Sequence, residues 1–326
     1  MIIKKSLFSG QRILSDFREW GIFFALLLIC GLMTLLSPYF LTTNNLFNVL
    51  LQAASISIIA AGFTVVLIAG EIDLSIGSAI GLVACVAAVL MIEVGLSPFL
   101  GITLSIFIGI LLGLFNGLST VIFRIPSFVV TLATLGIAHG TGLLLTAGRP
   151  VFGFNESYSF IGQGKIGPIP TPVILAIIVY AIIHFLLKKT SFGIQLYAVG
   201  GNREASELSG VRVNRIIVLA FVISGVCGAL SGIILSSRLD AGHGDFGASN
   251  LLDAVAAVVV GGTSLMGGAG SVIGTLGGVL IIATIRNGLI LMNVQAFWQE
   301  IVVGLIILIA VIVNQISKNE LSFSSK

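Results

Sequence analysis

The chain has 326 residues, of which 57% are hydrophobic and only 9% are charged, and its formal net charge at pH 7 is +3. A soluble domain carries roughly 25% charged residues, so this composition excludes a soluble enzyme and predicts a polytopic membrane protein. No basic run resembles a nucleic-acid-binding patch, which excludes nucleic acid as a partner.

Apolar runs of the length of a membrane span follow one another along most of the chain. A span needs about 20 mostly apolar residues. The candidate spans are residues 21–37, 47–69, 76–95, 99–123, 126–146, 172–187, 216–236, 251–265, 272–292 and 298–315. The eighth is short and runs into glycines, so it either spans fully or is re-entrant, and the count is nine or ten. No small-residue cleavage site follows the first run, which predicts a retained span rather than a signal peptide. The predicted fold class is all-α.

Basic residues predict how the spans are oriented, because Lys and Arg concentrate in cytoplasmic loops. With a cytoplasmic N-terminus and ten spans, only Arg149, Lys165 and Arg238 fall outside and Arg286 falls within a span. The basic residues that fall inside are Lys4, Lys5, Arg12, Arg18, Arg124, Lys188, Lys189, Arg203, Arg212, Arg215, Lys318 and Lys326. Both termini are therefore predicted to be cytoplasmic. The expected organisation is a cytoplasmic segment 1–20, a transmembrane domain 21–315 and a cytoplasmic tail 316–326.

One cytoplasmic loop, residues 188–215, is long for a connection between spans. It holds the glycine pair Gly200-Gly201, a short helix-forming run and a second glycine at Gly210. This arrangement is typical of a docking element held at the membrane surface. Two polar segments on the other side, residues 147–171 and 237–250, are expected to be ordered loops.

Glycines and a short repeated motif indicate how the spans pack. Gly109, Gly113 and Gly117 stand four residues apart, a spacing that lets helix backbones approach closely. Asn116-Gly-Leu lies late in the fourth span and Asn287-Gly-Leu late in the ninth, and another span follows each. The two span pairs run in opposite directions. This predicts an inverted repeat of spans 2–5 and 7–10, as in many transporters.

Polar groups at membrane depth are costly and often mark a pathway. Residues 70–78 connect two spans directly, without a separate loop. In this stretch Asp73 and Ser75 either cap the third helix or line a gate. Asp253 is interpreted as a helix cap. Arg286 is expected to snorkel, to pair with Glu300 or to face an aqueous cavity. The candidate pathway or gate residues are Asp73, Ser75, Ser78, Asn116, Asp253, Gly261, Gly262, Thr263, Ser264, Arg286 and Asn287.

No residue pattern points to catalysis or to a metal site. The glycine-rich run 261–270 lacks the lysine of a nucleotide-binding P-loop, so flexible backbone at a gate is the preferred interpretation. Cys30, Cys85 and Cys227 lie inside apolar runs. Two histidines, His139 and His184, lack metal-ligand companions. No nucleophile, base and acid occur together. The chain is therefore not expected to be an enzyme or to bind a cofactor.

Seven stretches of the chain match one family in order, namely residues 41–48, 70–78, 169–173, 197–202, 208–214, 252–264 and 297–308. Together they resemble the permease subunits of bacterial ABC sugar importers of the ribose/xylose/arabinose/galactose class. The resemblance covers nearly the whole chain. The runs Ile-Asp-Leu-Ser at 72–75 and Gly-Gly-Thr-Ser at 261–264 are its specific parts.

The resemblance implies a permease of the bacterial cytoplasmic membrane that moves a small pentose or hexose, with ribose favoured. It implies a second permease subunit, identical or a sister chain, with an identical one favoured. It further implies a cytoplasmic tandem ATPase that binds ATP and Mg²⁺, an extracytoplasmic sugar-binding protein and surrounding membrane lipid. The residues that match the family's ATPase-coupling helix are Asn202, Arg203, Glu204, Ala205, Glu207, Leu208 and Gly210.

The chain departs from the family at three positions. Glu71 and Ala269 stand where a glycine and a basic residue are usual, and Arg286 stands where an asparagine is usual. These differences leave the sugar and the identity of the second permease open. The alternative function is a secondary transporter driven by an ion gradient, which an inverted repeat and intramembrane charges would suit.

Overall fold

The computed structural model describes residues 21–323, with side chains up to residue 312, and it confirms the all-α class. The predicted segment 1–20 and the last three residues of the tail lie outside the described residues. The helices are Gly21–Leu36, α2 (Thr43–Ile68), α3 (Ile76–Ala88), the π-helix η1 (Val89–Glu93), α4 (Pro98–Phe123), α5 (Ser127–Leu145), α6 (Glu156–Gln163), α7 (Thr171–Lys189), α8 (Ser191–Gly201), α9 (Arg203–Leu208), α10 (Val213–Leu239), α11 (Ala248–Val260), α12 (Val272–Leu291) and α13 (Ala296–Phe323). The strands are β1 (Val151–Phe152), β2 (Lys165–Ile166), β3 (Ile169–Pro170) and β4 (Ala241–Gly242).

Seven helices in the described part of the chain are long and apolar enough to cross a membrane, and three shorter apolar helices accompany them. The shorter ones are Gly21–Leu36, Ala248–Val260 and Ala296–Ile312. These ten helices fall on the ten predicted spans. The 13 residues of α11 rise only about 20 Å, against a hydrocarbon thickness of about 30 Å. The count of ten therefore stays a prediction.

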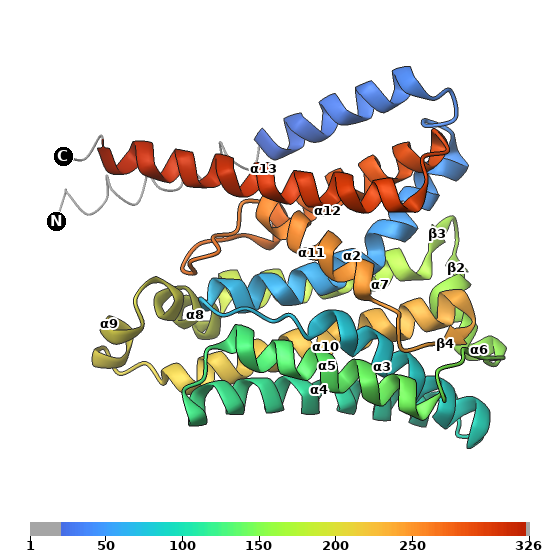
Figure 1. The fold of residues 1–326 in the computed structure, drawn as a ribbon, viewed down its shortest axis with the longest axis horizontal. Helices are drawn as coiled ribbons and strands as arrows, with labels where there is room; N and C mark the ends of the chain where they lie inside the picture. Colours follow the sequence, from blue (N-terminus) through green and yellow to red (C-terminus); the bar gives the residue numbers. More distant parts are fainter. Residues whose placement is uncertain (1–20, 324–326) are drawn as a thin grey trace.

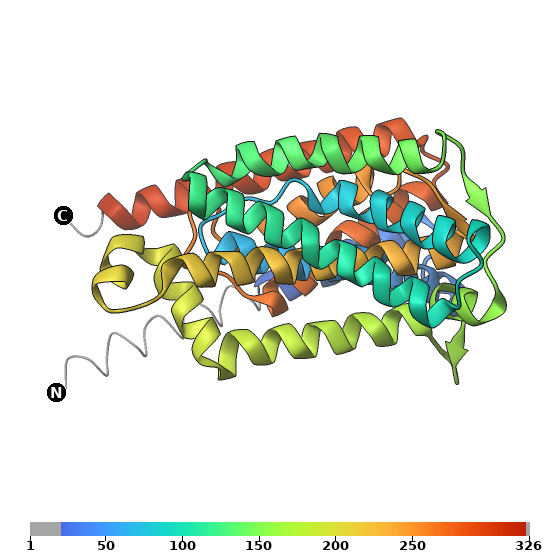
Figure 2. The same ribbon diagram turned by 90° about the horizontal axis from the view of Figure 1, so that it is seen from below.

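The long helices lie side by side with their axes roughly aligned (Figure 1). At one end of the bundle, called the α9 end, α8 and α9 project. The opposite end, called the β end, holds α6 and the two-stranded ribbons β1–β4 and β2–β3. The N-terminal helix starts on the α9 side and α13 finishes there. After a 90° turn, α5 and α7 lie on opposite sides of the bundle (Figure 2).

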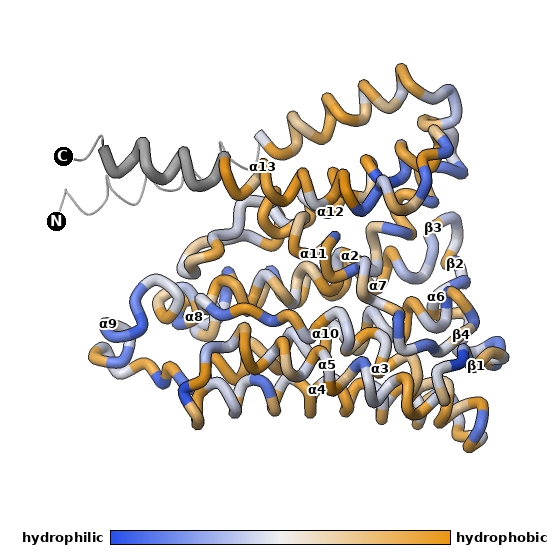
Figure 3. Tube along the Cα trace, viewed as in Figure 1, coloured by the Kyte–Doolittle hydropathy of each residue, from blue (hydrophilic) through white to orange (hydrophobic). Residues whose placement is uncertain are grey.

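Two central helices organise the packing. Helix α10 packs against α4, α2 and α3, while α2 packs against α12, α7 and α11. Apolar residues follow the helices, and hydrophilic residues gather at α9 and at the β end (Figure 3). Outward apolar side chains on α4, including Phe99, Phe115 and Phe123, are exposed. An exposed apolar face of this kind suits lipid, because the bilayer interior is as apolar as the protein core.

Some helix contacts in α2–α5 have counterparts in α10–α13. Helix α10 packs on α4 as α2 packs on α12, and α3 contacts α5 as α11 contacts α13. The symmetry itself stays a prediction.

Glycines bring α4 and α10 into backbone contact. A Cβ atom added at Gly113 would lie 2.7 Å from the Cα atom of Val222, and one at Gly109 would lie 2.6 Å from the Cβ atom of Ala229. The pair Gly136 and Gly140 on α5 differs, since nothing lies within 4 Å of an added Cβ in the described part of the chain. The same four-residue spacing therefore marks a helix interface in α4 and open space in α5.

This difference provides a matched test of the α4–α10 contact. Gly113→Ala should lower the free energy of unfolding by about 1–3 kcal/mol, because two backbones must separate to admit the methyl group. Gly136→Ala should leave stability unchanged or raise it, since alanine favours helix. Thermal unfolding in detergent, followed by intrinsic fluorescence, compares the two variants. Equal melting temperatures would contradict the contact.

Candidate functional site

Asp73 is a buried carboxylate in the break between α2 and α3, residues 69–75. It is 2% exposed. Its Oδ1 accepts hydrogen bonds from the Ser75 backbone N–H at 3.0 Å and from the Ser75 hydroxyl at 2.6 Å. Its Oδ2 accepts from the hydroxyl of Ser224 on α10 at 2.7 Å. Asp73 therefore satisfies a backbone donor where α3 begins, as the capping interpretation expects, and it also ties this start to α10.

The Ser75 side chain does not cap α3. Its hydroxyl accepts from the amide of Asn116 on α4 at 2.7 Å, and the Asn116 Oδ1 accepts from Thr134 on α5 at 2.6 Å. All of these side chains are buried. One polar network, called the Asp73 network, thus joins the break to α3, α4, α5 and α10. Ser78 lies beside it and donates to the Ser75 carbonyl at 2.9 Å.

The network contains predicted and unpredicted members. Asp73 and Ser75 were candidates because of the run 70–78 and Asn116 because of the Asn-Gly-Leu repeat, and the fold brings all three together. Ser224 and Thr134 were missed. Their only signal was a hydroxyl inside an apolar run, which is common in membrane helices because the side chain can bond its own backbone.

Helix α5 also holds the backbone of the break. The Ile72 N–H donates to the Ser127 hydroxyl at 3.0 Å, and the Ile72 carbonyl accepts from Thr131 at 3.1 Å. Non-helical backbone at membrane depth needs such partners, because the bilayer offers no water.

Asp253 and Arg286 form a second polar pair, between α11 and α12. The Arg286 Nε donates to Asp253 Oδ1 at 2.9 Å, and Nη2 lies 2.8 Å from the same oxygen. The carboxylate is buried and the Arg286 side chain is 16% exposed. A charged side chain at membrane depth is costly, so such residues almost always pair with one another.

The cap expected at Asp253 was wrong, and of the three alternatives for Arg286 the pairing with Glu300 was wrong. Asp253 does not cap α11, because the helix begins at Ala248 and places Asp253 within it. Arg286 is paired with Asp253 rather than Glu300, since α11 packs against α12 and turns the buried face that carries Asp253 toward it.

Asn287 makes a separate contact on α12. Its amide and that of Asn45 on α2 exchange two hydrogen bonds, of 2.8 and 2.9 Å, and both side chains are buried. Asn116 and Asn287 thus both join distant helices, but they do so with different partners. Among the described contacts, neither Asn287 nor the Asp253–Arg286 pair reaches the Asp73 network.

Residues 261–271, called the glycine loop, hold the remaining pathway candidates. Gly261 and Gly262 follow α11, and Thr263 and Ser264 are buried after them. The loop reaches the α9 end, where the Gly268 N–H donates to the Ile68 carbonyl at 2.9 Å and the Tyr197 hydroxyl donates to the Gly270 carbonyl at 2.7 Å. The pathway candidates therefore lie in separate places rather than in one cavity.

The expected short helix is present as α9, within residues 202–210, called the α9 segment. The Asn202 Oδ1 accepts from the Ala205 N–H at 2.9 Å as the helix N-cap. Gly210 takes the left-handed φ of +83° just after the helix, as glycine tolerates. Glu204, Glu207 and Leu208 are exposed, Leu208 to 85%. Arg203 forms an ion pair with Glu71 in the α2–α3 break.

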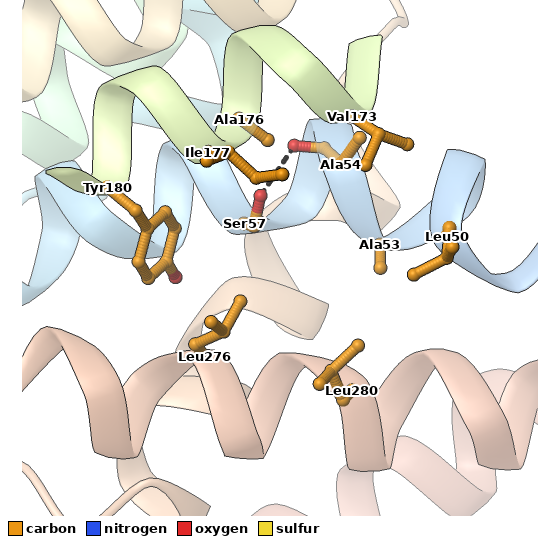
Figure 4. A pocket seen from close by; sticks show the side chains of 10 residues that line it. All are labelled: Leu50, Ala53, Ala54, Ser57, Val173, Ala176, Ile177, Tyr180, Leu276 and Leu280. Carbon is orange, nitrogen blue, oxygen red and sulfur yellow. Dashed lines mark hydrogen bonds between the residues drawn. The ribbon is translucent and has the colours of Figure 1, made fainter. Parts of the chain in front are cut away.

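An apolar groove of about 260 Å³ lies between α2, α7 and α12 (Figure 4). Its lining residues are Leu50, Ala53, Ala54, Ser57, Val173, Ala176, Ile177, Tyr180, Leu276 and Leu280. The Ser57 hydroxyl donates a hydrogen bond to the Ala54 carbonyl at 2.7 Å. A sugar needs several convergent polar groups, so this groove does not suit one.

The two segments at the β end are ordered, as expected. Strand β1 pairs with β4, and Asp240 accepts from the Phe154 N–H at 3.0 Å. His139 Nε2 lies 2.8 Å from Asp245 Oδ1, and this hydrogen bond lowers the pKa of the Asp245 carboxyl. Within the part of the chain that the structure describes, no three His, Cys, Asp or Glu side chains gather as metal ligands.

Comparison with known proteins gives consistent matches over most of the chain. The family described as "Branched-chain amino acid transport system / permease component" matches residues 45–311. The ribose import permease protein of Bacillus subtilis (strain 168) is 42% identical, over 91% of this chain and 93% of its own. The D-allose and xylose transport system permease proteins of Escherichia coli (strain K12) are 37% and 35% identical, covering 91% and 86% of this chain and 92% and 86% of their own. No solved structure matches.

The Asp73 network predicts a contrast between two buried serines. Ser224→Ala removes a donor to the Asp73 carboxylate and should cost about 1–3 kcal/mol of unfolding free energy. Ser105 is equally buried, but its hydroxyl has no hydrogen-bond partner among the described residues. Ser105→Ala should therefore be neutral or stabilising. Denaturant titrations of the two variants provide the measurement, and equal losses would argue against the network.

The Asp253–Arg286 pair predicts strong coupling between two substitutions. Asp253→Asn leaves a largely buried guanidinium without its counter-charge and should cost about 3 kcal/mol. Adding Arg286→Asn removes that unpaired charge and should restore part of the loss. A double-mutant cycle on thermal stability measures the coupling. Additive effects would mean that the two charges do not interact.

Proposed function

We propose a function from one premise: the chain belongs to the family of branched-chain amino acid transport system permease components. In this proposal it is the membrane-spanning permease subunit of an ATP-binding cassette importer. Its cargo is a small pentose or hexose, with ribose favoured, because the similar proteins are named for ribose import and for allose and xylose transport. In this proposal ATP is hydrolysed by a partner subunit, and the permease itself is not an enzyme.

The observation that carries the ATP-driven mechanism is the α9 segment. It is a short, well-capped helix at one end of the bundle, and it presents two acidic side chains and an exposed leucine, Leu208. A short helix that presents a leucine beside acidic side chains suits docking in a groove of a partner protein. The proposed partner is a cytoplasmic tandem ATPase, which binds ATP and Mg²⁺.

The α9 end is proposed to face the cytoplasm. The basic residues Lys188, Lys189, Arg203, Arg212 and Arg215 lie within or beside α8 and α9, as is typical of cytoplasmic loops. The first described helix begins on this side and α13 ends there (Figure 1). Both termini are then cytoplasmic, in the bacterial inner membrane. The ordered segments of the β end would receive an extracytoplasmic sugar-binding protein.

Transport is proposed to proceed by alternating access in a pair of permease subunits, with two identical chains favoured. Closure of the ATPase dimer would move the α9 segment. The pathway would then change its open side around the non-helical stretches, which are the α2–α3 break and the glycine loop. These stretches have fewer intrahelical hydrogen bonds than the spans, so they can change conformation at lower cost.

Reversing a charge on α9 tests the docking role. Glu204→Lys should abolish most sugar uptake while leaving the folded permease intact, because Glu204 is exposed and the change repels or misplaces the ATPase surface. Uptake of labelled ribose into proteoliposomes and co-purification of the ATPase are the two measurements.

Glu93→Lys is the matched control, since Glu93 is also exposed but lies away from α9, just before α4. It should co-purify with the ATPase like the wild type. Wild-type uptake by the normally expressed Glu204→Lys variant would refute the docking role. Uptake that needs no ATPase and collapses with an uncoupler would instead favour an ion-driven carrier.

A further inference from the structure

Glu71 is a buried acidic residue whose partner lies on the surface helix α9. Its side chain is 8% exposed, while that of Arg203, with which it forms an ion pair, is 53% exposed. Arg203 is the first residue of α9. The pair therefore connects the interior of the bundle to the α9 segment directly.

Glu71 begins a run of three residues that are held by different elements. Glu71 is held by α9 and Ile72 by Ser127 and Thr131 of α5. Asp73 is held by Ser75, the N-cap residue of α3, and by Ser224 of α10. Adjacent residues share a planar peptide unit, so they cannot be displaced independently by more than a short distance. A displacement of Glu71 is thus passed to α5 and to the Asp73 network.

A second attachment lies beside the ion pair, where three backbones meet without side chains between them. An added Cβ at Gly267 would lie 2.7 Å from the Gly70 Cα, and one at Gly268 would lie 2.7 Å from the Gly201 Cα. An added Cβ at Gly200 would lie 2.6 Å from the Gly268 nitrogen. The end of α8, the α2–α3 break and the glycine loop therefore pack as one unit, called the glycine junction.

From these contacts we infer that Glu71 is a positioning residue, which links movement of α9 to α5 and the centre of the bundle through its ion pair with Arg203. The inference rests on the proposed function, since it takes the ATPase as the source of that movement. In this inference the glycine junction is the pivot about which α9 moves. The ion pair between Glu71 and Arg203 then moves the α2–α3 break together with α9.

Replacing Arg203 and replacing Glu71 have different effects on stability, because the side chain that remains is buried in one case and half-exposed in the other. Without Arg203, a buried carboxylate keeps no counter-charge, whereas without Glu71 a half-exposed guanidinium remains solvated. Arg203→Gln should therefore reduce stability more than Glu71→Gln. Both variants should break the link between α9 and the α2–α3 break to the same extent. The loss of this link can therefore be distinguished from a loss of stability.

The test measures hydrogen exchange in the permease purified with its ATPase, with and without a non-hydrolysable ATP analogue and Mg²⁺. In the wild type, nucleotide should change exchange in both the α9 segment and residues 69–75. In Glu71→Gln and in Arg203→Gln, the response of the α9 segment should persist while that of residues 69–75 falls by about threefold or more. The double variant should be no worse than either single one. Arg203→Lys should retain the response.

Glu93→Gln serves as the control, because it removes an exposed carboxylate far from α9 and should leave both responses intact. An unchanged response of residues 69–75 in Glu71→Gln would overturn the inference while leaving the ATPase partnership standing. Failure of the wild-type permease to bind the ATPase, or an α9 segment that does not respond to nucleotide, would refute the proposed function and the inference with it.

Discussion

The Asp73 carboxylate imposes the constraint on which the centre of this bundle depends. A carboxylate without water must receive hydrogen bonds from the protein. Asp73 obtains them from the start of α3 and from Ser224 on α10. Ser75 then passes the network to Asn116 on α4. The position of the break, the register of α10 and the orientation of α4 are therefore fixed together.

Close backbone approach makes that polar centre possible. Short hydroxyl and amide side chains reach one another only if the helices that carry them lie close, and glycines permit this along α4 and α10. Gly113 faces the backbone of Val222, two residues before Ser224, and Asn116 follows on α4. Small residues and polar residues thus depend on each other. The first bring the helices together, and the second specify how they align.

The sequence allowed the fold class, the apolar helices and the short α9 helix to be predicted, because hydropathy and the glycines that bound a helix-forming run are local signals. It also singled out Asp73 and Asn116. It could not show that they share a network, since Ser224 and Thr134 become partners only through packing between distant segments. Asp253 was misassigned for a local reason: α11 begins at Ala248, in a polar stretch that hydropathy treats as loop.

The central place of α10 has a consequence for how the protein is made. Chains are synthesised from the N-terminus, and early segments begin to fold before later ones exist. Helices α2 to α5 therefore enter the membrane before Val213, where α10 starts, has been translated. Until then Asp73 lacks its Ser224 donor, and the glycine face of α4 is uncovered. The newly made N-terminal half is thus an incomplete insertion intermediate, which α10 completes by occupying a place between helices that were synthesised earlier.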